Sequence, residues 1–100
     1  NLVGTDAEGG AVPAAFALMP PAPNPVRAAT TLAYRLDRPG LARLELFDVL
    51  GRRVAVLVDE VQPAGSYTAR FDASALPSGT YLYRLTTDQH IATEKLVVVR

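Results

Sequence analysis

Short runs of alternating apolar and polar residues, each closed by a turn rich in Gly, Pro or Asp, constrain this chain more than any other feature. In Thr31–Leu36, the apolar residues Leu32, Tyr34 and Leu36 share one parity, and similar runs recur to the end of the chain. A period of two places successive side chains on opposite faces of a strand. Because no helical period competes with it, the pattern predicts an all-β fold.

Seven strands are expected, at residues 16–19, 31–36, 42–46, 54–58, 67–71, 81–85 and 91–99. About seven strands at regular spacing, each apolar on one face, predict an antiparallel β-sandwich of the immunoglobulin or fibronectin-III kind. Parity places nine large side chains in its core. They are Leu32, Tyr34, Leu36, Leu44, Leu46, Phe71, Tyr81, Tyr83 and Leu85.

The chain divides into a linker and a globular body. Residues 1–15 are small and rich in Gly and Ala, which predicts a flexible linker, followed by a β-sandwich domain over 16–100. Four prolines between Pro20 and Pro25 exclude a helix and a central strand, so this stretch should run extended along an edge or a surface. Asn1 is not a usual first residue and no signal peptide follows it, so we expect a piece of a longer protein.

Composition argues against several classes of function. Ten basic and ten acidic residues cancel, so the chain has no field to attract nucleic acid or anionic lipid. The absence of Cys excludes disulfides and thiolate chemistry. The longest apolar run, Leu96–Val99, is much shorter than a membrane span. We therefore expect no nucleic-acid partner and no membrane span.

The side chains that carry catalysis do not form a recognisable group in the sequence. His90 is the only histidine and lies in an expected hairpin turn, where a solvated turn residue is the preferred interpretation over a catalytic base. The three serines, Ser66, Ser74 and Ser78, lie in or beside turns. Carboxylates at strand ends leave a weak calcium site open, but lack EF-hand spacing. We expect no enzymatic activity, no cofactor and no metal centre.

The corner before the sixth expected strand has its own physical logic. Leu76 can close the end of the core, Pro77 stiffens the crossing, and Gly79 permits a turn that other residues resist. The hydroxyl of Tyr81 is placed to bond backbone near Asp72–Leu76, as in the tyrosine corner of immunoglobulin-like sandwiches. The alternative interpretation, a half-buried aromatic without that bond, stays open.

Five sequence blocks occur one after another towards the chain end. They are Pro23-Asn24-Pro25, the strand Thr31–Leu36, Asp48-Val49-Leu50-Gly51-Arg52-Arg53-Val54, the stretch Asp72–Tyr81 with Leu76, Pro77, Gly79 and Tyr81, and the tail Lys95-Leu96-Val97-Val98-Val99-Arg100. Together they closely resemble the type A C-terminal sorting domain of the type IX secretion system of Bacteroidetes-type bacteria, over about residues 16–100. Val26, in place of a common aromatic, and Arg100, in place of a common Lys, depart from the family pattern.

The resemblance implies a non-catalytic sorting signal. The parent protein would cross the inner membrane by a separate N-terminal signal, fold in the periplasm and leave through the outer-membrane machinery, becoming secreted or bound to the cell surface. A surface protease of the system usually removes the domain and often joins the cargo to a surface lipopolysaccharide. The partners implied are the secretion machinery, that protease and the cargo domain in cis.

Two other functions compete with this one: a carbohydrate-binding module and an inert fibronectin-like spacer of a secreted hydrolase. Sugar-binding sandwiches commonly present a platform of exposed aromatic rings. This chain has no Trp, and Phe47 is the one aromatic of the expected strands whose parity points outwards. A single outward ring is more often a packing residue under a loop.

The tail is apolar on both faces. Leu96 and Val98 share one parity, while Val97 and Val99 share the other. Such a strand is either covered on both sides within the domain or available to a partner. The family resemblance favours recognition by the secretion machinery, through strand addition or docking of a face, with a basic residue flanking the tail at each end.

Overall fold

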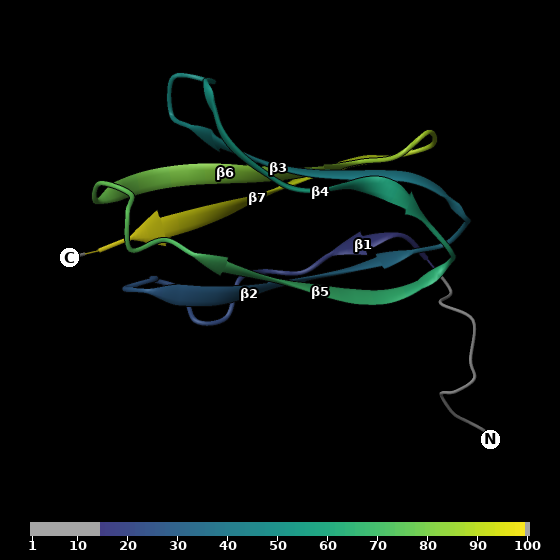
Figure 1. Ribbon diagram of the computed structural model, residues 1–100, viewed down its shortest axis with the longest axis horizontal. Helices are drawn as coiled ribbons and strands as arrows, with labels where there is room; N and C mark the ends of the chain where they lie inside the picture. Colours follow the sequence, from purple (N-terminus) through teal and green to yellow (C-terminus); the bar gives the residue numbers. More distant parts are fainter. Residues whose placement is uncertain (1–14, 100) are drawn as a thin grey trace.

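The computed structural model describes residues 15–99 as two antiparallel sheets packed face to face (Figure 1). One sheet has the strand order β1-β2-β5 and the other β4-β3-β6-β7. The strands are β1 (Ala17–Leu18), β2 (Ala29–Leu36), β3 (Gly40–Asp48), β4 (Arg53–Gln62), β5 (Gly65–Asp72), β6 (Gly79–Thr86) and β7 (Ile91–Val98). The expected all-β sandwich of seven strands is confirmed.

Most strands are longer than the alternation alone predicts. Gly40, Gly65 and Gly79 were expected in turns but begin β3, β5 and β6. β4 continues to Gln62 through the acidic pair that follows Val58, because an edge strand exposes much of its surface and tolerates charge there. Backbone pairing therefore extends beyond the residues whose side chains reveal the strand.

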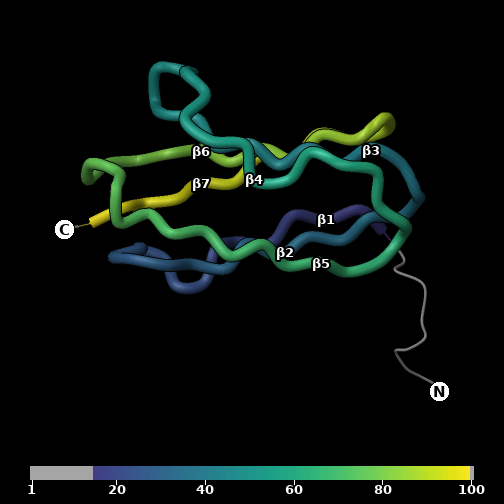
Figure 2. The backbone as a smooth tube through the Cα atoms, viewed as in Figure 1, coloured from purple at the N-terminus to yellow at the C-terminus, as the bar shows by residue number. Residues whose placement is uncertain are grey.

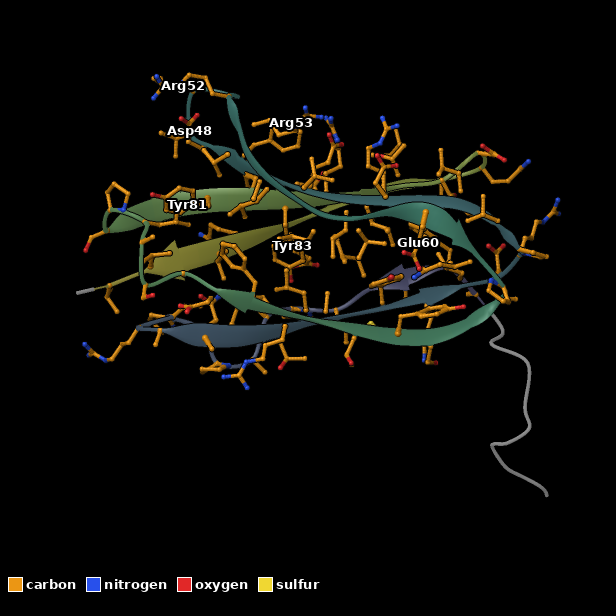
Figure 3. All side chains as sticks on the ribbon, in the orientation of Figure 1. Asp48, Arg52, Arg53, Glu60, Tyr81 and Tyr83 are labelled. Atoms are coloured by element: carbon orange, nitrogen blue, oxygen red, sulfur yellow. The ribbon has the colours of Figure 1, made fainter. Side chains whose placement is uncertain are left out.

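The core is made by the inward faces of both sheets (Figure 3). Eight of the nine expected core side chains are buried, while Phe71 is only partly buried. The reason is that Phe71 lies on β5, at the edge of the smaller sheet. The core also contains residues that parity did not identify, namely Val26, Ala42, Ala73, Leu96 and Val98.

Two buried tyrosines join the sheets by hydrogen bonds. Tyr34 of β2 donates its hydroxyl hydrogen to Gln62 Oε1 of β4 at 2.8 Å, and Tyr83 of β6 donates to the Met19 carbonyl after β1 at 2.6 Å. Burial raises the pKa of both phenols, so both stay protonated donors over the physiological range. Each bond satisfies a polar group that would otherwise be costly to bury.

Strand pairing defines two ends of the sandwich. Gly79 pairs with Val98 and Asp48 with Tyr81 near one end, whereas Leu36 pairs with Gly65 near the other. The motif end comprises Val26, 48–52, 72–79 and Val98, and the opposite end comprises Ala17, 37–40, 62–65 and 87–90. Figure 2 shows the chain passing repeatedly between these ends. The linker expected over 1–15 lies outside the described residues except for Ala15.

Candidate recognition surface

The turn between β3 and β4 is held by one carboxylate. Asp48 Oδ1 accepts the backbone N–H groups of Leu50 at 2.9 Å and Arg52 at 3.0 Å, and Oδ2 accepts Arg52 Nε at 2.8 Å. The backbone bond from Arg52 is the largest cause of a lowered Asp48 pKa. Gly51 has φ +84°, a left-handed conformation that favours glycine. The motif Asp-x-Leu-Gly-Arg thus encodes a preorganised turn.

This turn presents an apolar tip to solvent. Val49 is 68% and Leu50 74% exposed, and both follow directly after the carboxylate that fixes the turn. In Figure 3, Asp48 and Arg52 project from this turn, which stands away from the sheet above Tyr81. Two exposed aliphatic residues on a rigid turn add nothing to the core and are suited to contact with another molecule.

The corner between β5 and β6 forms as its residue types predict. Tyr81 is 6% exposed and donates its hydroxyl hydrogen to the Pro77 carbonyl at 2.8 Å. The acceptor lies one residue beyond the expected range Asp72–Leu76. Leu76 is half-buried against the core end, as expected, and Gly79 has φ +153°.

A groove of about 360 Å³ separates this corner from the β3–β4 turn. One wall consists of Asp48, Val49, Leu50, Arg52 and Val54, and the other of Leu76, Pro77, Ser78, Gly79, Thr80 and Tyr81. Most of its lining is apolar, with the Arg52 side chain at the rim. Two motifs about 24 residues apart along the chain therefore form one surface.

The proline-rich segment lies against the tail. Val26 N–H donates to the Val97 carbonyl at 2.7 Å, and Val99 N–H donates to the Val26 carbonyl at 2.9 Å. Asn24 Oδ1 accepts the Val97 N–H at 3.1 Å. The segment runs extended beside an edge strand, as its prolines predict. Val26, a departure from the family pattern, is fully buried.

The blocks other than the strand Thr31–Leu36, which runs towards the opposite end, therefore form a continuous band across the motif end. Val26 bridges to Val98, Val98 pairs with Gly79, and the corner that begins at Leu76 faces the Asp48 turn across the groove. Pro23 joins through its carbonyl, which accepts the Thr30 hydroxyl at 2.9 Å. Lys95 lies apart, exposed along β7 opposite Leu82, and Arg100 lies outside the described residues.

The tail itself is an edge strand with one buried face. Leu96 and Val98 are buried in the core, whereas Val97 and Val99 on the other face are half-buried. β7 has β6 as its one neighbour within its sheet. The arrangement combines the two interpretations of the tail, since one face is structural while the outer edge and face are partly accessible.

The outward aromatic residue Phe47 does not form a sugar platform. The guanidinium of Arg84 lies 4.5 Å from its ring centroid, a cation–π contact that covers the ring face. Arg84 also approaches Glu45 Oε1 at 3.7 Å, and Arg53 approaches Oε2 at 3.1 Å. Glu45 alternates with the core residues Leu44 and Leu46, so parity places it on the outer face of the strand. It is nevertheless buried, because these two arginines lie over it.

His90 has partners that the sequence does not reveal. Its ring stacks on Phe16 with centroids 4.6 Å apart, and Nε2 lies 3.3 Å from Asp37 Oδ2. These contacts tie the start of the described chain to two turns of the opposite end. The sequence gives little indication of these contacts, because Phe16, Asp37 and His90 are far apart along the chain. Each of them lies in or beside an expected turn or strand end.

Within residues 15–99, no three His, Cys, Asp or Glu side chains are grouped closely enough to hold a metal ion. The same part of the chain contains no helix long and apolar enough to cross a membrane.

Two solved structures align with this chain. The structure of dimeric latent PorU from Porphyromonas gingivalis aligns with a TM-score of 0.66 and 21% identity, covering 95% of this chain and 10% of PorU. The chain thus matches a small part of PorU, and the likeness concerns the fold. The Ig1 domain of mouse SynCAM 2 aligns with a TM-score of 0.44 and 12% identity, covering 84% of this chain and 92% of that domain. No curated protein matches this sequence.

The family described as the secretion system C-terminal sorting domain matches residues 22–99. The match spans the segment beside the tail, both turns that line the groove and the tail itself. The resemblance drawn from the sequence blocks is therefore confirmed, and the chain belongs to the family of secretion system C-terminal sorting domains.

Proposed function

We propose that this sorting domain directs its parent protein through the outer membrane by type IX secretion, and that the machinery reads it at the motif end. The observation that carries the proposal is that the proline-rich segment, the Asp48 turn, the Leu76–Tyr81 corner and the end of the tail lie together at the motif end. Their residues fix turns and an edge rather than forming a group of catalytic side chains. A non-catalytic address is the function that this geometry supports best.

The finer steps follow from the family. The parent protein reaches the surface through the periplasm, the secretion machinery and its surface protease are the partners, and the cargo is joined in cis. Cleavage falls within residues 1–15, before Phe16, because proteases need accessible, extended backbone. The cargo is then released or joined to a surface lipopolysaccharide. Mass spectrometry of the exported parent tests the cleavage site, and a cut inside Leu32–Leu85 would contradict it.

A reporter fused before the chain, expressed in a bacterium with type IX secretion, tests the address function. The unchanged fusion should reach the medium or cell surface, and a fusion without the chain should remain in the periplasm. Periplasmic retention of the unchanged fusion would refute the sorting role.

Two matched substitutions test where the domain is read. Leu50 at the motif end and Val61 on β4 towards the opposite end are both 74% exposed. Leu50→Asp should reduce export at least several-fold, whereas Val61→Asp should leave it unchanged. Thermal unfolding of both variants controls for stability. Equal export of the two variants would show that the apolar tip is not read.

The tail requires a subtler change than deletion. Removing residues 97–100 should stop export, but it also removes Val98 from the core. Val97→Asp changes the outer face while leaving Leu96 and Val98 in place. Loss of export by a folded Val97→Asp variant supports recognition of the tail, whereas export that falls only with unfolding favours a structural role.

A further inference from the structure

We propose that the segment Pro23–Val26 is an exchangeable clasp on β7, and that the secretion machinery binds the tail by replacing it with an extended strand of its own. The inference rests on the proposed sorting function and specifies how the secretion machinery contacts the tail. It concerns the outer edge of β7, the side that faces away from β6.

The clasp covers only the last part of that edge. Val97 and Val99 both turn backbone groups outwards, where Val26 and Asn24 bond them. The pairing of β6 with β7 runs without a register shift, so Thr93 and Lys95 turn outwards with the same alternation. Both are exposed, and no clasp residue pairs with them. The clasp therefore bonds the end of this edge, at Val97 and Val99, but not its earlier part at Thr93 and Lys95.

The clasp is an incomplete strand. Val97 N–H is bonded by the side chain of Asn24, where a regular parallel neighbour would supply a backbone carbonyl. In the ladder with β7, only Val26 contributes both backbone groups, in a single bridge. A regular strand would satisfy the same groups and extend the ladder to Lys95 and Thr93.

The occupant that fits is therefore an extended segment of a protein. It needs a carbonyl opposite Val97 N–H, a donor opposite the Val97 carbonyl, and at least two further residue pairs beyond them. Side chains on the outer face beside Val97 and Val99 would be apolar, because those valines are half-buried there. Strand addition to a sheet edge obtains affinity from the main chain and specificity from alternate side chains.

A disulfide that locks the clasp tests the exchange. Val26 and Val98 are directly opposite in a parallel bridge and both are buried. Neighbouring strands lie about 4.7–4.9 Å apart, within the range of roughly 4.4–6.8 Å between the Cα atoms of a disulfide. The chain has no Cys, so Val26→Cys with Val98→Cys introduces one defined pair. The two single variants carry the same packing changes without the cross-link.

A second disulfide provides the matched control. Ala17 of β1 pairs with Arg35 of β2 near the opposite end, so Ala17→Cys with Arg35→Cys locks a segment that the proposal leaves in place. The reporter fusion should be exported by both single variants and by this control. Export of the oxidised Val26→Cys, Val98→Cys fusion should be at least tenfold lower than export of the control. A reductant should restore it. Export of the oxidised clasp variant at the control level would overturn the inference.

Amide hydrogen exchange provides a measurement that needs no cross-link. In the isolated chain, the N–H groups of Val97 and Val99 are bonded by the clasp, whereas those of Leu96 and Val98 face β6. An exchangeable clasp predicts exchange at least tenfold faster for the first pair than for the second. Equal protection would show that the clasp opens only when the domain unfolds. Failure here leaves the sorting function intact, because export of the unchanged fusion tests that function separately.

Discussion

The two ends of the sandwich contain the same five-residue corner in different surroundings. Pro63-Ala64-Gly65-Ser66-Tyr67 lies at the opposite end and Pro77-Ser78-Gly79-Thr80-Tyr81 at the motif end. In each, the tyrosine donates to the proline carbonyl four residues earlier, at 2.6 Å for Tyr67 and 2.8 Å for Tyr81. The glycines have φ +154° and +153°.

The surroundings separate these two corners. Tyr81 is buried and lines the groove, whereas Tyr67 is half-buried and stacks on Tyr34 with centroids 5.3 Å apart. Local sequence therefore builds the corner, while burial decides how much stability depends on it. Adjacent motifs decide whether it contributes to a recognition surface.

The largest expected difference is in stability after truncation of the tyrosines. Tyr81→Ala should lower the free energy of unfolding by about 3–5 kcal/mol, because it removes a buried aromatic ring. Tyr67→Ala should cost about half as much, since its ring is partly exposed. Urea denaturation measures both, and equal losses would show that burial does not distinguish the corners.

Replacing the glycine should destabilise the two corners to a similar extent, in contrast to replacing the tyrosine. Gly65→Ala and Gly79→Ala should each lower the free energy of unfolding, by of the order of 1–3 kcal/mol, because the backbone conformation is strained for alanine. An added Cβ meets nothing within 4 Å at Gly79 and only the Tyr67 ring, at 3.8 Å or beyond, at Gly65. Similar losses by thermal denaturation are expected, and an unchanged midpoint for either variant would contradict a shared backbone constraint.

Removing only the hydroxyl groups gives a smaller contrast. Tyr81→Phe should cost about 0.5–1.5 kcal/mol, because the Pro77 carbonyl loses its partner in a partly buried site. Tyr67→Phe should cost less, since water can reach the Pro63 carbonyl. Chemical denaturation of the two variants compares them, and a larger loss for Tyr67→Phe would reverse our ranking.

Low pH should destabilise the Asp48 turn at the motif end. We expect this to be the smallest of the four effects on stability. The pKa of Asp48 lies below its ordinary value in the folded state, chiefly because the backbone N–H of Arg52 bonds the charged form. The sign follows from linkage: this stabilisation is complete above the unfolded pKa and is lost as the pH falls through the folded pKa. The difference between the native chain and Asp48→Asn in the midpoint of thermal unfolding should therefore become smaller as the pH is lowered. A constant difference from neutral pH to pH 2 would argue against the role of the carboxylate.

The strands and most of the core could be predicted because the alternation of apolar and polar residues shows on which face of its strand each side chain lies. Leu32, Leu44 and Tyr83 are buried as their parity requires. Phe71 was assigned too deep a position, since parity gives a face but not the position of a strand within its sheet. Glu45 was assigned to the surface because the arginines that cover it come from other strands.

The sequence indicated the parts of the candidate recognition surface but not their arrangement in space. The family blocks identified Asp48, Gly79 and the tail, but the groove and the clasp depend on contacts between segments that are distant in sequence. Asn24 illustrates the limit, since its side chain bonds Val97, 73 residues away. Adjacent sequence contains nothing that specifies such a partner.

The placement of the two ends gives the domain the geometry of a handle. Its longest dimension is 44 Å, and Ala17 lies at one extremity while the groove and the end of β7 lie at the other. In the sorting function that we propose, a folded cargo joined ahead of Ala17 would lie at a distance from the partner that binds the motif end. Cargoes of different size and shape could then present the same accessible end to one receptor, without a change in either partner.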